Sequence, residues 1–491
     1  MAHAPSPQQS AIFQWFAQGK GNLVVRARAG TGKTTTILEG INHAPERRIL
    51  LAAFNKRIAM ELTQRLANPR AEAKTLHGVG FGCIVRNWQG TQINEDRGYT
   101  LARECVTDDV PDEIVGLIKK LASRCKGTCP FPVIADVIAE AQDADIMPDT
   151  DHEKNGWDVK YLAGRAMAAM DLACRRDGTI DFDDMIFVAL RNKWVFGRFD
   201  LVVIDEAQDM NAAQLMLAQL SCKTGGRIAV VGDDRQAIYG FRGADSNSVD
   251  RLKAALKAAE LGLTVTYRCP KAVVAAAQEL VPDFMAAPTA PTGSVTRMVR
   301  DAMLDAAAPG DFILSRKNAP LIGTCMALLR RGKRAKVEGR DVGRGLIALV
   351  KKLAAKSIPD FLLALGEWRE RENERADALP ETRRANKREN IADTAETLTV
   401  LTEGLTAVPE LLARVQSLFA DIGADGASVI VCSSVHKAKG LERDTVYLLE
   451  DTFAKPGAGR EEMNIRYVAI TRSKNALVWV TDPNRVPTPA H

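Results

Sequence analysis

The sequence lacks the long hydrophobic runs that membrane proteins and secreted precursors carry. None of its apolar stretches approaches the roughly 20 residues that a membrane-spanning helix needs. The first residues, Met1–Pro5, have neither the basic nor the apolar region of a secretory signal. We therefore expect no membrane partner and a cytoplasmic location, including the cytoplasm of a host cell.

The sequence also lacks clustered cysteines and a one-sided charge. Of nine cysteines only Cys125 and Cys129 lie close together, with no second cysteine or histidine pair nearby. This pattern favours reduced thiols over a metal site. The net charge of +5 over 491 residues excludes a polycation. Any contact with nucleic acid must therefore come from local grooves.

Short apolar runs alternate with helical patterns in two separate blocks. A chain of 491 residues is too long for one compact core. The runs read as buried strands of parallel sheets, which gives an α/β fold class. They comprise 23–25, 49–54, 201–204 and 228–231 in the first block, and 312–314, 428–433 and 445–449 in the second. Residues 369–389 are so highly charged that we expect a solvated helix or a linker there.

A phosphate-binding loop is indicated by Gly30–Thr36, which directly follows the apolar run Leu23–Val25. In such a strand–loop–helix segment, backbone N–H groups and the helix N-terminus surround the phosphates, and Lys33 reaches the β and γ oxygens. The hydroxyl of Thr34 is placed to bind Mg²⁺. Ala27 stands where the strict loop pattern has its first glycine, but the cradle depends mainly on the later glycines and the lysine.

A second apolar run, Leu201–Ile204, ends in two carboxylates. Asp205 at the end of a buried strand is placed to hold the same Mg²⁺ ion as Thr34. Glu206, beside it, is placed to polarise an attacking water. Together the two segments predict a nucleoside triphosphatase that uses Mg²⁺.

Further strings in the sequence closely resemble the UvrD/Rep family of superfamily 1 DNA helicases, in order from Gln8 to Lys474. They are Gln8–Ile12, Ile204–Asp209, Val230–Ala244, Val435–Glu442 and Tyr467–Ser473. Within the family, Phe182–Met185 and the compact length look most like the F-box DNA helicase branch and its bacterial or phage counterparts, although no F-box is seen. The resemblance implies a bacterial cell or a phage-infected host.

The resemblance implies two RecA-like P-loop domains, each with a parallel sheet and each interrupted by a mainly helical insertion. The first core domain is expected at 1–89 and 176–260, with its insertion at 90–175. The second core domain is expected at 261–340 and 426–491, with a shortened insertion at 341–425.

The resemblance also gives roles to residues around the nucleotide. Gln8 matches the glutamine that reads the adenine edge, and Tyr267 the residue that stacks on the base. Arg268 and Arg472 match two arginines that reach the γ-phosphate from the second core domain, where such a group is worth about 10³–10⁵ in rate. Glu442 matches a carboxylate that accepts a ribose hydrogen bond. The alternatives are an ordinary polar residue for Gln8 and surface ion pairs for the two arginines.

The predicted nucleotide site is therefore drawn from both core domains. The residues expected to bind ATP are Gln8, Ala27, Arg28, Ala29, Gly30, Thr31, Gly32, Lys33, Thr34, Thr35, Tyr267, Arg268, Gly440, Glu442 and Arg472. Those expected to carry hydrolysis are Lys33, Asp205, Glu206, Gln236, Arg268 and Arg472, with Thr34 and Asp205 as metal ligands. The amides of Gln208 and Gln236 are suited to sensing the γ-phosphate or water, so we expect them to couple the site to its surroundings.

Binding to single-stranded DNA needs aromatic faces for the bases and cations or amides for the backbone. The residues that fall at the family's DNA-contacting positions are Phe54, Asn55, Thr75, His77, Tyr239, Phe241, Arg242 and His436. Phe54 and Tyr239 could alternatively be core aromatics, and the histidines could be structural. Phe241 stands where relatives commonly carry tryptophan.

The resemblance implies an ATP-dependent DNA helicase that translocates 3′ to 5′ on single strands and unwinds duplex, in repair, recombination or replication. The short second insertion leaves open a translocase that strips proteins, such as recombinase filaments, and unwinds little. A nucleotide-dependent binding module without catalysis is a third alternative, which the intact Lys33, Asp205 and Glu206 disfavour. Expected partners are single-stranded and duplex DNA, with protein partners undefined and the chain a monomer or transient dimer.

Overall fold

The computed structural model describes residues 5–148, 150–238, 248–377, 381–419, 428–455 and 457–482. The chain divides into two compact units, Met1–Thr264 and Val265–His491, which we call the first and second units. Each unit is described by itself. The predicted α/β class with RecA-like parallel sheets is confirmed in both of them.

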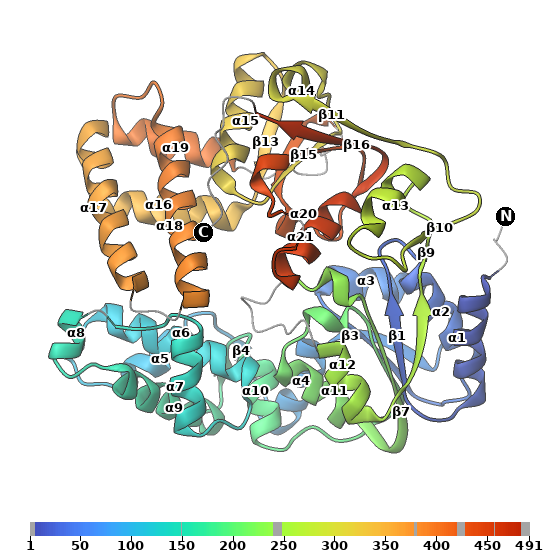
Figure 1. The fold of residues 1–491 in the computed structure, drawn as a ribbon. Coiled ribbons are helices and arrows are strands. Elements are labelled where there is room, and N and C mark those ends of the chain that lie inside the picture. Colours follow the sequence, from blue (N-terminus) through green and yellow to red (C-terminus); the bar gives the residue numbers. More distant parts are fainter. Residues whose placement is uncertain are drawn as a thin grey trace. The chain divides into compact units, whose positions relative to one another are not determined.

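The described part of the first unit is built on a six-stranded sheet whose strands all pair in parallel (Figure 1). Its order is β3-β2-β6-β7-β1-β8. The strands are β1 (Leu23–Ala27), β2 (Ile49–Ala53), β3 (Ala71–Thr75), β6 (Phe199–Ile204), β7 (Cys222–Gly232) and β8 (Ala259–Leu263). The carboxyl ends of β1, β6 and β7 therefore lie side by side at one edge.

Helices cover both faces of this sheet because alternate strand residues point to opposite sides. Leu23 and Val25 of β1 pack on one face with α1 (Pro7–Gln18), α2 (Lys33–His43) and α3 (Lys56–Arg65). Val24 packs on the other face. The helices there are α4 (Leu76–Asn87), α10 (Asp184–Arg191), α11 (Ala212–Ser221) and α12 (Ser248–Leu256).

A helical insertion interrupts the first unit between α4 and α10. It comprises α5 (Arg97–Glu104), α6 (Asp112–Thr128), α7 (Ile134–Asp143), α8 (Thr150–Lys154) and α9 (Val159–Arg175). A short parallel pair, β4 (Gln92–Ile93) and β5 (Thr179–Ile180), closes its base. The insertion shares one apolar core with α4 and α10, so it is continuous with the domain that carries the phosphate loop.

The described residues of the second unit contain another six-stranded parallel sheet, in the order β11-β16-β15-β12-β14-β13. Its strands are β11 (Ser294–Val299), β12 (Phe312–Ser315), β13 (Ala335–Glu338), β14 (Ile430–Ser434), β15 (Arg443–Leu449) and β16 (Ser473–Thr481). Around it lie α13 (Lys271–Gln278), α14 (Arg300–Ala306), α15 (Asn318–Arg330), α20 (Val435–Ala438) and α21 (Arg460–Ile470). A small pair, β9 (Val265–Thr266) and β10 (Met285–Ala286), precedes the sheet.

Between β13 and β14 the second unit is helical. The elements are α16 (Arg340–Leu353), α17 (Ile358–Asp377), α18 (Glu381–Thr402) and α19 (Val408–Leu418). They share one apolar core with α15 and the sheet. The charged stretch 369–389 thus forms the end of α17 and the start of α18, with 378–380 outside the described residues. Across the described ranges, none of the helices is both long and apolar enough to span a membrane.

Candidate nucleotide site and nucleic-acid surface

The phosphate loop connects β1 to α2 at the carboxyl edge of the first sheet. Gly30 and Gly32 adopt positive φ angles of 67° and 76°, which glycine reaches without the steric cost a side chain brings. Gly32 is the N-cap of α2, and the helix begins at Lys33. The first N–H groups of α2 therefore face the loop, and these groups together with the helix dipole suit anionic phosphate.

Lys33 is held by the glutamate that follows β6. Its Nζ lies 2.9 Å and 3.0 Å from the two carboxylate oxygens of Glu206. Burial alone would lower the pKa of Lys33, but the carboxylates of Glu206, Asp205 and Asp233 outweigh it and raise that pKa. The lysine is thus a buried, charged group whose partner is another residue of the predicted hydrolytic set. Glu206 itself has a positive φ of 51°, a strained conformation for a non-glycine residue.

The residues predicted to bind Mg²⁺ have suitable chemistry for that ion. Asp205 is 3% exposed at the end of β6. Burial first, and then the neighbouring Glu206 charge, raise the pKa of Asp205 to about 6. Mg²⁺ is held through one or two carboxylates together with phosphate oxygens and waters. Asp205 and the Thr34 hydroxyl fit that requirement. Within the described ranges, no group of three or more His, Cys, Asp or Glu residues is arranged to hold a metal.

Two glutamines, Gln208 and Gln236, join the ends of β6 and β7. Gln208 Nε2 donates to Glu206 Oε2 at 2.5 Å, and Gln208 Oε1 accepts from the backbone N–H of Asp233 at 3.1 Å. Gln236 Nε2 donates to Asp233 Oδ2 at 2.6 Å. Gln208 lies in the 3₁₀ turn η1 (Ala207–Asp209) and Gln236 in η2 (Asp234–Gln236). Both amides are therefore part of the polar network behind the phosphate loop.

Gln8, predicted to read adenine, uses its amide within the first unit. Its Nε2 donates to the Thr264 hydroxyl at 2.9 Å, and its Oε1 accepts from the Thr264 N–H at 3.0 Å. The next residue, Gln9, donates to Thr36 of α2 at 3.1 Å. The start of α1 is therefore fixed to both the end of the first unit and the helix after the phosphate loop. Sequence reasoning did not identify the part played by Gln9.

The second unit contains the two predicted arginines, each with partners inside that unit. Arg268 forms an ion pair with Glu442, the residue predicted to accept a ribose hydrogen bond. Arg472 is 1% exposed and donates to the backbone oxygens of Val468 and Leu441. Burial, followed by the nearby Arg268 charge, lowers the pKa of Arg472 to about 10.

Two other predicted nucleotide contacts of the second unit lie at its surface. Tyr267 is 52% exposed, as a ring available for stacking must be. Gly440 is exposed and adopts a positive φ of 84°.

Two predicted DNA contacts in the first unit are also helix N-caps. Asn55 accepts a hydrogen bond from the Ile58 N–H at the start of α3. Thr75 accepts one from the Gly78 N–H at the start of α4. Both lie at the carboxyl ends of neighbouring strands, β2 and β3, and Phe54 beside Asn55 is half-buried. The caps explain the local sequence without excluding DNA contact, because an N-cap oxygen sits at a helix end that attracts phosphate.

His77 and Phe182 form an aromatic pair at the junction of the first sheet with its insertion. Their ring centroids are 6.5 Å apart in an edge-to-face arrangement. Burial lowers the pKa of His77, which favours the neutral ring, while Phe182 is 53% exposed. In the sequence, Phe182 indicated only a family resemblance, and its exposure as a surface aromatic was not predicted. Its place beside a predicted DNA contact could not be read from the alternation of apolar residues.

The remaining predicted DNA contacts are divided between the second unit and the undescribed part of the chain. His436 lies half-buried in α20. Tyr239, Phe241 and Arg242 lie outside the described residues.

Comparisons with known proteins agree with the resemblance seen in the sequence. The family model for the UvrD/REP helicase N-terminal domain matches residues 6–257, and that for the UvrD-like helicase C-terminal domain matches 429–480. A similar relative is the ATP-dependent DNA helicase PcrA of Staphylococcus aureus (strain Mu50 / ATCC 700699), 25% identical over 283 residues, which are 53% of this chain and 38% of that protein. The PcrA proteins of Bacillus subtilis (strain 168) and Leuconostoc citreum are 26% and 25% identical, covering 53% and 47% of this chain. These matches span 37% and 33% of the two relatives.

Proposed function

The chain belongs to the UvrD/REP helicase family, and we propose that it is an ATP-dependent DNA helicase that moves 3′ to 5′ on single-stranded DNA. The observation that carries the proposal is the cluster at the carboxyl edge of the first sheet. A glycine-rich loop, a buried Lys33, the strand-end Asp205 and the adjacent Glu206 meet there. These are the groups that phosphoryl transfer to water requires.

The residues of the first unit divide this chemistry among themselves. Lys33 and the N–H groups of α2 bind the β- and γ-phosphates, while Thr34 and Asp205 would hold Mg²⁺. The bound ion supplies neutralisation of the charge that develops on the transferring phosphoryl group. Because Lys33 is paired with Glu206 in this structure, nucleotide binding must exchange that carboxylate for phosphate oxygens. Glu206 is then released to polarise the attacking water.

The second unit completes the proposal with its arginines. We assign Arg268 and Arg472 to the γ-phosphate, Tyr267 to stacking on the base and Glu442 to the ribose. Arg268 must exchange its Glu442 partner to do so. Hydrolysis then depends on the approach of the two units, and this dependence links ATP turnover to movement along DNA.

The DNA path in the first unit is proposed to cross the ends of β2 and β3. Phe54, Asn55, Thr75 and His77 lie there, and the exposed Phe182 beside His77 adds a ring to the same surface. Stacking of a base on such a ring is worth about 1–3 kcal/mol. That range includes the mean of about 1.4 kcal/mol for one DNA stacking step. Freed bases can therefore be held against re-pairing.

The test is ATP turnover by the full chain with single-stranded DNA, duplex DNA or RNA, followed by unwinding of duplexes with 3′ or 5′ overhangs. We expect turnover to be stimulated most by single-stranded DNA, and unwinding to need the 3′ overhang. Turnover that does not respond to any nucleic acid would remove the proposal. Unwinding from the 5′ overhang alone would reverse its polarity.

A translocase that clears proteins from DNA is the second candidate. The two family matches leave residues 258–428 between them, and this stretch contains the helical region between β13 and β14. Displacement of a recombinase filament together with weak unwinding of a forked duplex would favour that function. Either function acts on single-stranded and duplex DNA, in the cytoplasm of a bacterium or of a phage-infected host.

A further inference from the structure

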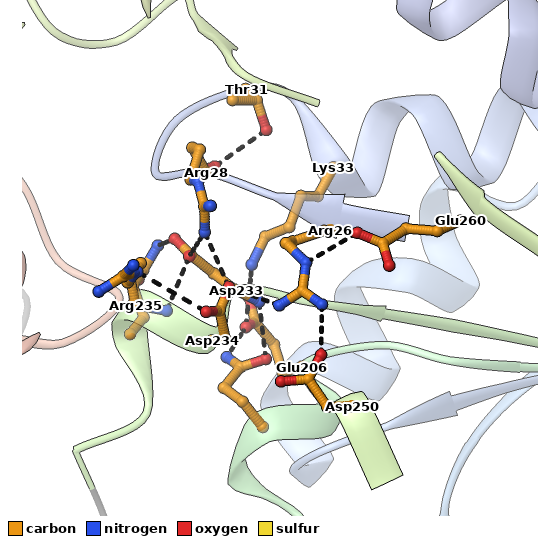
Figure 2. A network of polar contacts seen from close by, with 12 residues as sticks. Arg26, Arg28, Thr31, Lys33, Glu206, Asp233, Asp234, Arg235, Asp250 and Glu260 are labelled. Carbon is orange, nitrogen blue, oxygen red and sulfur yellow. Dashed lines mark hydrogen bonds and ion pairs between the residues drawn. The ribbon is translucent and has the colours of Figure 1, made fainter. Parts of the chain in front are cut away.

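Arg28 lies in the phosphate loop, but its side chain leaves the loop for the end of the neighbouring strand β7 (Figure 2). Its Nη1 lies 2.8 Å from Asp234 Oδ1 and 3.3 Å from Asp233 Oδ1. Its backbone is fixed as well, because its N–H donates to the Leu263 carbonyl and its own carbonyl accepts from the Thr31 hydroxyl. The guanidinium is buried. Arg28 is therefore a short, desolvated link between two loops.

The same two loops are joined by a second route that starts at Lys33. Lys33 binds Glu206, Gln208 donates to Glu206, and the N–H of Asp233 donates to Gln208. Both cations of the phosphate loop thus reach the segment Gly232–Ile238, one directly and one through Glu206 and Gln208. A change in the charge inside the loop acts on both routes.

The nearby cations counteract the effect of burial on the pKa of Asp233 and Asp234 to different degrees. Burial raises the pKa of Asp233 despite the opposing charges of Lys33 and Arg28. For Asp234, burial is outweighed by Arg28 and Arg26, so its pKa is lowered. Asp234 also begins the turn η2, after which the chain runs through Ala237 and Ile238 to the predicted DNA contacts that start at Tyr239. The arginine link therefore ends where the DNA-contacting segment begins.

We propose that Arg28 is a positioning residue that transmits nucleotide occupancy from the phosphate loop to Gly232–Ile238, and from there to the DNA-contacting segment. Triphosphate oxygens bring several negative charges into the loop and compete with Asp233 and Asp234 for the guanidinium. When the guanidinium turns toward the phosphates, Asp234 loses its nearest cation and Asp233 loses one of the two cations that face it, and η2 shifts. This inference rests on the proposed function for its biological output, but its first step needs only nucleotide binding.

Hydrogen–deuterium exchange tests that first step without DNA. Peptides that cover residues 228–238 are compared in the full chain with and without a saturating non-hydrolysable ATP analogue. We expect the analogue to change exchange in this segment in the unaltered protein. The change disappears in a chain that carries Arg28→Met together with Asp234→Asn, a pairing that removes one charge of each sign from the buried ion pair. Equal changes in both proteins at saturation would overturn the proposal.

Arg26→Met is the matched control. Arg26 also binds Asp234, at 3.2 Å, but from strand β1 and with further partners in Asp250 and Glu260. We expect its loss to leave the nucleotide-induced change in exchange in place. If Arg26→Met removed the nucleotide-induced change in exchange as completely as the Arg28 variant, the change would depend on the charge around Asp234 and not on Arg28. The proposal would then fail.

Steady-state kinetics test the output. We expect the stimulation of ATP turnover by single-stranded DNA to fall about 10-fold in Arg28→Met/Asp234→Asn, within the range usual for coupled sites. Arg28→Lys, which keeps the charge but not the forked donors, should recover part of the stimulation. A variant that lost nucleotide affinity but kept the full stimulation ratio would contradict the coupling role.

The two hypotheses fail separately. A protein that binds nucleotide but shows no DNA-stimulated turnover removes the helicase, and the exchange experiment still decides on Arg28. A working helicase with unchanged exchange in the Arg28 variant removes only the coupling role.

Discussion

The first unit contains two buried clusters of charge that look alike in composition and differ in what holds them. The phosphate-loop cluster comprises Arg28, Lys33, Glu206, Asp233 and Asp234. The insertion cluster comprises Arg97, Lys126, Asp181 and Asp184. Each joins an arginine and a lysine to carboxylates, and each contains an aspartate whose pKa burial raises.

The insertion cluster is bonded into the backbone. Arg97 donates to the carbonyls of Thr179, Ala173 and Arg176, while Asp181 and Asp184 each accept a hydrogen bond from the other's N–H. Those bonds hold α5, α9, β5 and α10 together at the base of the insertion. Loss of these hydrogen bonds would separate the elements at the base of the insertion.

In the phosphate-loop cluster, Lys33 and Arg28 bind carboxylates whose place a phosphate can take. An ion pair of this kind can be exchanged for another without loss of structure. Burial and a shifted pKa therefore do not by themselves distinguish a site from a structural cluster; the exchangeability of the partners does.

The largest effect that this comparison predicts is on catalysis at Lys33. We expect Lys33→Ala to lower DNA-stimulated ATP turnover by about 10³-fold or more, because the cation on the β- and γ-phosphates is lost. The free energy of unfolding should change less than at Lys126, since Glu206, the carboxylate that pairs directly with Lys33, is partly exposed. Turnover and urea unfolding of the same preparation check both statements. Substantial remaining turnover would place the phosphates elsewhere.

Lys126→Met is the counterpart in the insertion cluster. The side chain of Lys126 is 4% exposed, against 10% for Lys33, and its Nζ lies 2.7 Å from Asp184 Oδ1. Its loss leaves two carboxylates, Asp181 and Asp184, with Arg97 as the remaining cation of the cluster, so we expect the free energy of unfolding to fall by about 3–5 kcal/mol. At low temperature, ATP turnover per folded molecule should stay within about twofold of that of the unaltered protein. This change is much smaller than the loss of about 10³-fold expected for Lys33→Ala.

The control for this prediction is the double variant Lys126→Met/Asp181→Asn, which removes one charge of each sign and keeps the ion pair between Arg97 and Asp184. It should regain part of the lost stability. If the Lys126→Met protein kept its stability but lost ATP turnover, the insertion cluster would be a second functional site. The distinction between a functional and a structural cluster would then be wrong.

The sequence was sufficient to predict the elements that meet at the nucleotide site. The apolar runs of β1, β6 and β7 and the glycines before Lys33 are local signals, and the structure has the strands there. The links between these elements are not local. Arg28 and Asp234 are 206 positions apart, and Lys33 and Glu206 are 173 apart. The local sequence does not distinguish a charged residue in solvent from one in a buried ion pair, so no sequence pattern predicts these partners.

The same reason explains what the sequence left open on the nucleic-acid surface. Asn55 and Thr75 are recognisable as helix caps, because each is an N-cap residue type directly before a helix. Phe182 gives no such signal, and it lies in a turn where Asp181 and Asp184 accept hydrogen bonds from each other's N–H. The assignments of Arg268 and Arg472 to the γ-phosphate stay predictions.

A smaller effect is expected at this surface. Phe182→Ala should weaken binding of single-stranded DNA by about 1–3 kcal/mol, the usual contribution of one stacked base. Stability should change by less than about 0.5 kcal/mol because the ring is exposed. Equilibrium titration with a fluorescent oligonucleotide measures the affinity, and Phe182→Tyr should retain it. Phe196→Ala, at a ring that is 62% exposed, is the matched control; an equal loss there would point to nonspecific surface effects.

The smallest effect separates the two roles of Thr75. As the N-cap of α4 it accepts the Gly78 N–H at 3.0 Å, so Thr75→Ala should lower the free energy of unfolding by about 1 kcal/mol. Thr75→Asp keeps a capping oxygen but adds a negative charge. If DNA phosphate passes this helix end, the aspartate should preserve stability and weaken DNA binding by about 1 kcal/mol, the Coulomb energy of two charges at contact distance in water.

Asn55→Asp applies the same change to the cap of α3 and should behave alike, since both caps lie at the ends of paired strands. Raising the salt concentration should shrink the DNA effect and leave the capping effect in place, because exposed charges are screened. Two aspartate variants that bind DNA as tightly as the parent at low salt would move the DNA path away from the ends of β2 and β3.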